Sequence, residues 1–232
     1  MSNLLVIVLA KTVLLAVLAA RTAPGRAYIA KLLARGYAIG TLFGLAFFVL
    51  FYLLVPAIGY HADVTFAFIA VNATLSYGAT AATVALLPIG LARREPHAPL
   101  TRERTYYTLV TGAAVVAFAA TGNGFVRAFC TGVALMSLAE VAALLCGRAG
   151  PVSRMLHFDM RPLALVLAAS AGLGAFYEAV NLVFPVWDWI TLDGLPRGAR
   201  AGLMIAVGYI VLIHPAFVVT RLLIGAPDQR DS

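Results

Sequence analysis

Charged side chains are scarce in this chain of 232 residues, because Asp, Glu, Lys and Arg together make up only 12% of it. A soluble domain carries roughly 25% charged residues, so an ordinary soluble fold is excluded. Hydrophobic residues make up 62% of the chain, which is typical of an integral membrane protein. The net charge of +7 does not indicate nucleic-acid binding, because the basic residues lie in connections between apolar stretches.

Cysteine is almost absent, and the sequence patterns of metal and cofactor sites are missing. Cys130 and Cys146 fall in one expected helix, where sixteen residues separate them by roughly 24 Å and exclude a disulfide between them. Zinc-protease, GxSxG, P-loop and aspartate-rich magnesium motifs do not occur. His214 is the one histidine expected at membrane depth, which argues against a two-histidine haem. The last apolar stretch has no lysine for a retinal Schiff base. We expect no metal and no cofactor.

Long apolar stretches are what the sequence has in abundance. A membrane-spanning helix needs about 20 such residues. The stretches are 3–20, 37–57, 64–90, 105–121, 125–146, 162–184 and 201–220. They predict an all-α integral membrane protein with about seven transmembrane helices in one bundle, residues 1–232 forming a single transmembrane domain without a soluble domain. Because the first stretch is short, a six-span arrangement with that stretch lying flat is the alternative.

Basic residues are distributed unevenly between the two ends of the expected bundle. Thirteen of the 17 lie after the first, third and fifth stretches or in the C-terminal tail, and three lie on the opposite side. Because basic residues mark the cytoplasmic side, this bias predicts an N-terminus outside and a C-terminus in the cytoplasm. We expect a multi-pass protein of the bacterial inner membrane.

Six polar side chains lie at membrane depth, where each is costly and often marks a functional site. They are Lys11, Asn72, Glu140, Glu178, Asn181 and His214. The helical rise places Lys11, Asn72 and Glu178 roughly 9–12 Å from the outer ends of their stretches. The same estimate places Glu140 and His214 roughly 20 Å in, so an outer and an inner layer are expected.

Each layer contains one expected pair of opposite charge. Lys11 and Glu178 form the outer pair, supported by Asn72 and by Asn181, which shares a helix face with Glu178. Glu140 and His214 form the inner pair. If the outer pair exists, Glu178→Gln destabilises the protein and Lys11→Met recovers part of the loss. For every one of these groups a purely structural role, holding helices together, is the alternative.

Trp187, Asp188 and Trp189 follow the sixth stretch. Tryptophan is enriched at the boundary between membrane and water, which predicts an interface anchor. The alternative is the rim of an outward-facing pocket, with Asp188 as a polar group on it.

Small residues recur every fourth position on two stretches and predict close helix contacts. They are Ala70, Thr74, Gly78 and Ala82 on the third stretch, and Ala164, Ala168 and Gly172 on the sixth. These ridges favour docking to a membrane-protein partner or a second copy of the chain.

Three functions fit these features. The favoured one is a non-catalytic subunit or binding module of a membrane complex that holds a lipid or small hydrophobic ligand. The second is a small transporter with a Lys/Glu/Asn site, which the lack of a detectable inverted repeat disfavours. The third is an enzyme acting on an isoprenoid or other lipid, with Glu178 or Glu140 as general acid, because an apolar site favours a protonated carboxyl group.

Overall fold

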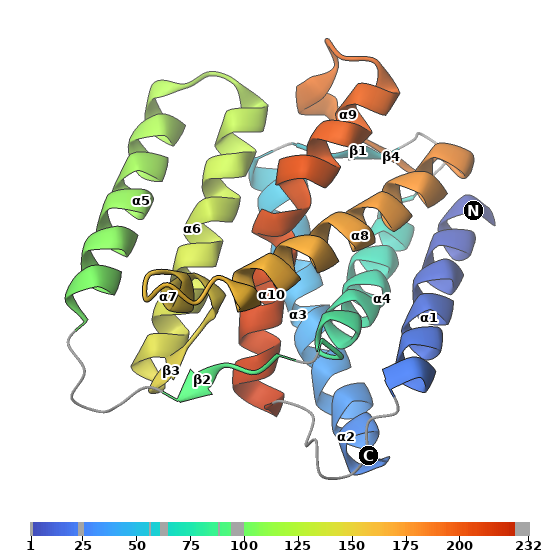
Figure 1. Cartoon of the computed structure of the whole chain (residues 1–232). Helices are drawn as coiled ribbons and strands as arrows, with labels where there is room; N and C mark the ends of the chain where they lie inside the picture. Colours follow the sequence, from blue (N-terminus) through green and yellow to red (C-terminus); the bar gives the residue numbers. More distant parts are fainter. Residues whose placement is uncertain are drawn as a thin grey trace.

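The computed structural model describes residues 2–22, 26–55, 57–60, 65–87, 89–93 and 100–225, which are almost entirely helical (Figure 1). The α-helices are α1 (Ser2–Thr22), α2 (Arg26–Lys31), α3 (Tyr37–Phe48), α4 (Phe66–Val84), α5 (Thr101–Ala120), α6 (Gly124–Leu145), α7 (Pro151–Met155), α8 (Arg161–Val183), α9 (Arg197–Leu203) and α10 (Tyr209–Ile224). The π-helical segments are η1 (Leu32–Gly36), η2 (Val49–Leu54) and η4 (Met204–Gly208), and η3 (Ile190–Leu192) is a 3-10 turn. The strands are β1 (Gly59–Tyr60), β2 (Ala92–Arg93), β3 (Arg148–Ala149) and β4 (Trp187–Asp188). The predicted all-α fold is confirmed.

Each predicted apolar stretch corresponds to helix in the structure. In chain order the stretches match α1, α3 with η2, α4, α5, α6, α8, and α9 through α10. Within the described chain, four helical segments are long and apolar enough to cross a membrane: Tyr28–Tyr52, Gly124–Leu145, Arg161–Val183 and Arg197–Ile224. These segments are compatible with a membrane protein. Seven spans and their orientation remain predictions.

The second helix begins earlier than its sequence suggests. It is continuous from Arg26 through α2, η1, α3 and η2 to Leu54, whereas the predicted stretch begins at residue 37. The basic residues Lys31 and Arg35 therefore lie on a helix and not in a loop. No proline interrupts this segment, and apolar residues between the basic ones extend the packing face.

Helix α10 is at the centre of the helix packing. It contacts α3, α4, α6 and α8, and most of its residues are buried. Helices α5 and α6 pack side by side at one flank, while α1 packs against α4 and α8 at the other (Figure 1). The largest fully buried side chain, Phe217, belongs to α10. Most side chains of α10, including His214, are thus enclosed by other helices.

Two short antiparallel strand pairs join connecting segments to one another at opposite ends of the bundle (Figure 1). Strand β1 pairs with β4, so that Gly59 is opposite Asp188. Strand β2 pairs with β3, so that Arg93 is opposite Arg148. The first pair holds the segment that follows α8 over the end of the bundle, which positions the tryptophans described below.

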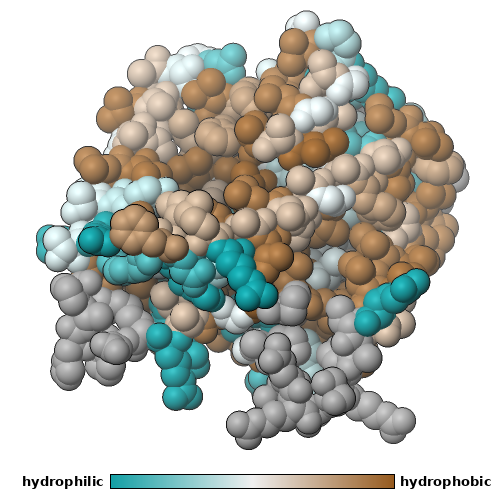
Figure 2. All heavy atoms as spheres, viewed as in Figure 1, coloured by the Kyte–Doolittle hydropathy of each residue, from teal (hydrophilic) through white to brown (hydrophobic). Residues whose placement is uncertain are grey.

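The visible surface is largely apolar. Figure 2 shows hydrophobic residues over the broad middle of one face, with hydrophilic residues gathered mainly toward its lower edge. Large apolar side chains are exposed on the outer helices, including Leu109 and Val116 of α5 and Val13 of α1. A surface patch of this extent marks contact with a membrane or a protein partner.

The two small-residue ridges have different surroundings. Gly78 of α4 lies against α3, because a Cβ atom on Gly40 would approach the Gly78 Cα to 2.7 Å. The ridge on the third stretch therefore serves, at Gly78, a contact inside this chain. On α8, Ala164, Ala168 and Gly172 are exposed. Docking of a partner through α8 remains a prediction.

Candidate functional site

The inner polar layer is assembled as the sequence predicts. Glu140 of α6 and His214 of α10 are both fully buried, and Glu140 Oε1 lies 3.0 Å from His214 Nε2. A buried carboxylate and imidazole at this distance form an ion pair when the histidine is protonated. The pair joins the central helix to one flank of the bundle.

Further donors enclose the Glu140 carboxylate. Oε1 accepts a hydrogen bond from the backbone N–H of Val152 at 2.9 Å. Oε2 accepts from the hydroxyls of Ser153 at 2.8 Å and Tyr107 at 3.1 Å, and from the Ser153 N–H at 3.3 Å. A Cβ atom on Gly150 would lie 2.6 Å from the carboxyl carbon, so a larger residue there would press on the group. Protein groups therefore contact both oxygens of the carboxylate.

Sequence reasoning missed Tyr107 and Ser153 as partners of Glu140. One signal was available: Pro151 follows Gly150, and proline favours the first position of a helix. The first N–H groups of a helix have no partner within it and need an acceptor. Glu140 supplies that acceptor to α7, and thereby attaches the segment after α6 to the bundle.

The outer layer differs from its prediction at Lys11. The side chain is 8% exposed, and Nζ donates a hydrogen bond to Ser76 Oγ on α4. Nζ also lies 4.0 Å from the centre of the Tyr177 ring and 5.8 Å from that of Trp187. Within the described part of the chain, no ion pair joins Lys11 to Glu178, because both side chains are directed to other partners.

Glu178 is buried among aromatic donors and not beside the lysine. Its Oε1 accepts hydrogen bonds from Trp189 Nε1 and from the Tyr209 hydroxyl, both at 2.8 Å. Buried Trp and Tyr each carry one polar hydrogen that needs an acceptor. Glu178 satisfies both, which explains why it is drawn away from Lys11.

Asn181 holds the backbone that follows α8. Its Nδ2 donates to the carbonyl of Trp187 at 2.9 Å, and its Oδ1 accepts from the N–H groups of Val186 at 3.0 Å and Trp187 at 3.2 Å. Asn181 therefore fixes the course of the chain into β4. The side chain of Asn72, the remaining member of the predicted layer, lies outside the described residues.

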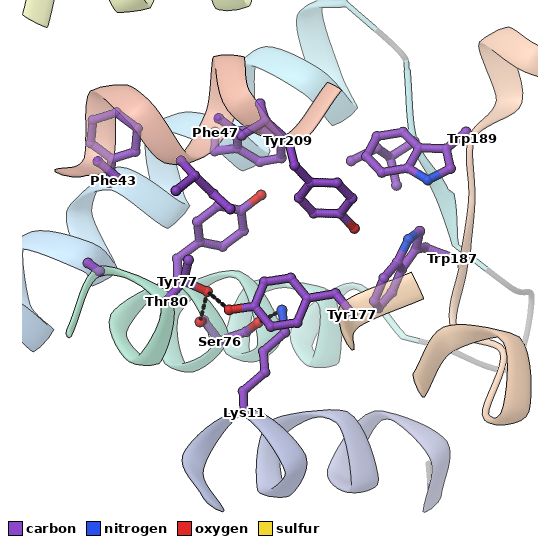
Figure 3. Close-up of a pocket in the computed structure, with 15 residues that line it drawn as sticks. Lys11, Phe43, Phe47, Ser76, Tyr77, Thr80, Tyr177, Trp187, Trp189 and Tyr209 are labelled. Carbon is purple, nitrogen blue, oxygen red and sulfur yellow. Dashed lines mark hydrogen bonds between the residues drawn. The ribbon is translucent and has the colours of Figure 1, made fainter. Parts of the chain in front are cut away.

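The tryptophans after α8 turn inward. Trp187 and Trp189 are each 7% exposed, and both line a cavity (Figure 3). Asp188 between them is half-buried, and its Oδ1 lies 3.7 Å from Arg197 Nε. The pocket-rim alternative expected Asp188 as a polar group on the rim, but Asp188 is not among the residues that line this cavity.

The cavity has a volume of about 60 Å³ and lies between α1, α3, α4, α8 and α10. A cavity of this size can hold water or a small polar group. Its lining residues are Lys11, Phe43, Phe47, Ile58, Ser76, Tyr77, Thr80, Ala81, Tyr177, Trp187, Trp189, Tyr209, Leu212, Ile213 and Ala216. Aromatic rings make up most of the labelled wall, and Lys11 enters from one side (Figure 3). The cavity thus combines apolar ring faces with one amine.

Hydrogen bonds hold the polar part of this wall in place. Thr80 Oγ1 lies 2.8 Å from the Tyr177 hydroxyl and also donates to the carbonyl of Ser76 at 2.9 Å (Figure 3). Tyr209 begins α10 directly after the π-helical segment η4, and its hydroxyl donates to Glu178. π-helical segments are frequent at functional sites. Lys11 therefore lies among side chains that hydrogen bonds hold in place.

A second opening, of about 340 Å³, lies between α1, α4 and α8 and is almost wholly apolar. It is lined by Leu14, Leu18, Thr83, Val84, Leu86, Leu87, Ala169, Gly172, Leu173 and Phe176. Leu14 and Leu18 follow Lys11 at helical spacing on the same face of α1. This second opening and the aromatic cavity are therefore both bounded by α1, α4 and α8. The hydrogen bond between Thr80 and Tyr177 joins α4 to α8.

Metal binding finds no support in the part of the chain that the structure describes. There, no three His, Cys, Asp or Glu side chains gather in a way that could hold an ion. Comparisons of the chain with models of protein families, with curated proteins and with solved structures find no match. The function must therefore be argued from the geometry of the cavity.

Proposed function

We propose that this chain is a polytopic membrane protein that binds a small amphiphilic ligand in the cavity around Lys11, as a binding module or as a non-catalytic subunit of a membrane complex. The observation that carries the proposal is a buried amine, Lys11 Nζ, at the wall of an aromatic cavity. A ligand oxygen placed there would complete the hydrogen bonding of the amine.

The donor capacity of Lys11 supports this role. The Lys11 side chain has at least two N–H donors whether or not it is charged, and Ser76 accepts one hydrogen bond from Nζ within the described chain. A buried donor left without an acceptor costs about 1–3 kcal/mol. A carbonyl or carboxylate oxygen in the cavity would recover that cost and give the site its orientation.

The walls suit the apolar part of such a ligand. Small-molecule sites are mostly apolar and aromatic with few polar groups, as this cavity is. Its 60 Å³ accepts the polar end of a ligand and not a whole lipid. The ligand is thus expected to place only its head beside Lys11.

For the membrane arrangement we propose seven spans with the N-terminus outside and the C-terminus in the cytoplasm of a bacterial inner membrane. The distribution of basic residues supports this orientation, because thirteen of 17 lie on one side. Labelling of single cysteines tests it, with Gly122→Cys in a chain whose Cys130 and Cys146 are replaced by Ala, and with Cys146 itself, the exposed native residue next to position 147, in a chain whose Cys130 is replaced by Ala. We expect a membrane-impermeant thiol reagent to reach position 122 from outside and Cys146 only after lysis.

The enzyme alternative is less well supported. Glu140 is saturated by protein donors and lies outside the cavity lining. Glu178 accepts two hydrogen bonds on Oε1 and is also outside the lining. Neither carboxyl group is placed to transfer a proton to a ligand beside Lys11.

Native mass spectrometry of the full chain, extracted gently from its own membrane, tests the proposal. We expect a stoichiometric additional mass of small-molecule size that Lys11→Met removes. Lys31→Met is the matched control, because Lys31 is exposed on α2 and should leave the ligand bound. A ligand retained equally by both variants, or a wild-type chain without ligand, would contradict the proposal.

A further inference from the structure

Lysine is rare in this chain, which has two lysines among its 17 basic residues. Lys31 is exposed on α2. Lys11 is buried at the cavity wall, beside a hydroxyl and a ring face. The sequence places the other 16 basic residues on one side or the other of the expected bundle, so Lys11, in the middle of α1, is exceptional.

The surroundings of Lys11 favour a nucleophilic amine. Removal from water disfavours the charged form of an amine. The Glu178 carboxylate acts on Lys11 only through space, since among the described residues no direct contact joins the two side chains. Among the described residues, the polar partner of Nζ is the neutral Ser76 hydroxyl, and Glu178 is directed to Trp189 and Tyr209. Lysines desolvated in hydrophobic pockets are the ones that form Schiff bases.

We propose that Lys11 Nζ forms an imine with the carbonyl carbon of an amphiphilic aldehyde or ketone whose head enters the cavity. The inference rests on the proposed function and specifies the chemical class of the ligand. The amine, the cavity in front of it and the hydrogen-bonded Ser76 are the features that carry it.

The reaction balances without a further reagent. The Nζ lone pair forms the bond to the carbonyl carbon, and the carbonyl π electrons move to the oxygen, which takes up a proton. Loss of that oxygen as water then forms the C=N bond, and the two amine hydrogens leave with it. Ser76 Oγ, bonded to Nζ, is a positioning group that can relay these protons.

The same walls account for retention of the product. Hydrolysis of an imine requires water at the former carbonyl carbon, and a ligand head that fills the cavity would exclude water from that position. Tyr177 and Trp187 lie over Nζ, so their rings cover the position of the new bond. A covalent ligand would therefore persist in the membrane protein.

The test uses the full chain in lipid nanodiscs at neutral pH, with hexanal as the probe and sodium cyanoborohydride to reduce any imine to a stable amine. Peptide mass spectrometry then compares Lys11 and Lys31 within the same molecules. We expect Lys11 to be alkylated at least about tenfold faster than Lys31, since a tenfold difference corresponds to only about 1.4 kcal/mol in the barrier. Burial alone would give the opposite order.

Variants keep the test independent of folding. Lys31→Arg should leave the alkylation of Lys11 unchanged, and Ser76→Ala should slow it about tenfold by removing one hydrogen bond. Alkylation confined to Lys31, equal at both lysines, or absent from both overturns the inference. If Lys11 is not alkylated but Lys11→Met still removes the natively bound mass, the proposed function stands with a noncovalent ligand. If Lys11 is not alkylated and Lys11→Met does not remove a natively bound mass, both proposals fail.

Discussion

Glu140 and Lys11 are both ionisable side chains inside apolar helices, yet their surroundings are opposite. Glu140 receives hydrogen bonds from Tyr107, Val152 and Ser153, contacts His214, and is not among the residues that line the cavity. Lys11 donates to one hydroxyl and faces a cavity. The difference teaches that burial among apolar helices does not by itself distinguish a charged group held by protein partners from one that faces a cavity. The number of hydrogen bonds that the protein itself makes to each group does distinguish them.

The largest expected effect comes from removing the saturated group. Glu140→Ala should lower the free energy of unfolding by about 3–5 kcal/mol, because it leaves His214 and several donors buried without a partner. Chemical unfolding in mild detergent, followed by tryptophan fluorescence, measures the change. Glu103→Ala is the comparison, since Glu103 also meets a histidine, but one that is half-exposed. A similar loss of unfolding free energy in Glu103→Ala would show that the additional donors around Glu140 contribute no stability beyond that of a carboxylate–histidine contact.

Crowding the same group should have the next largest effect. An alanine at Gly150 would push a methyl group onto the Glu140 carboxyl, so Gly150→Ala should cost about 1–3 kcal/mol in unfolding free energy. Gly172→Ala is the matched control, because a Cβ atom there meets nothing within 4 Å. Gly172 lies inside α8, so the control should gain about 0.5–1 kcal/mol from reduced chain entropy. Equal behaviour of the two glycine variants would argue against a tightly filled Glu140 site.

Removing Asn181 tests whether the loop after α8 shapes the ligand cavity. Asn181→Ala leaves backbone groups of Val186 and Trp187 without partners and should cost about 1–2 kcal/mol. It should also weaken ligand retention in native mass spectrometry, because Trp187 lines the cavity. Thr131→Ala, on the exposed side of α6, should change neither quantity. Full ligand retention in Asn181→Ala would separate the loop from the binding site.

The sequence predicts the helical class and the inner pair for a physical reason. Both depend on regular helices, in which a rise of about 1.5 Å per residue converts position into depth. Glu140 and His214 were matched in this way, and the structure brings them together. The same estimate also placed Lys11 near Glu178 in depth, but depth carries no information on direction around a helix.

The partners that decide the outer layer come from a segment that is not part of a regular transmembrane helix. Trp189 reaches Glu178 because β4 pairs with β1 and folds the chain back over the bundle. Asn181 determines this course through backbone hydrogen bonds, which leave no periodic signal in a sequence. Ser76, the partner of Lys11, is a small residue in an apolar helix and equally inconspicuous.

The smallest expected effect is the most informative about the comparison. In a double-mutant cycle, Glu140→Gln and His214→Phe should show a coupling above about 1 kcal/mol, because contacting groups in one network are not additive. Glu178→Gln and Lys11→Met should instead add within about 0.5 kcal/mol, because each residue has other partners. Unfolding free energies of the single and double variants supply both couplings under identical conditions. A strong coupling between Lys11 and Glu178 would restore the ion pair that the sequence predicts, would give the amine an anionic partner, and would remove the reason for expecting it to react as a nucleophile.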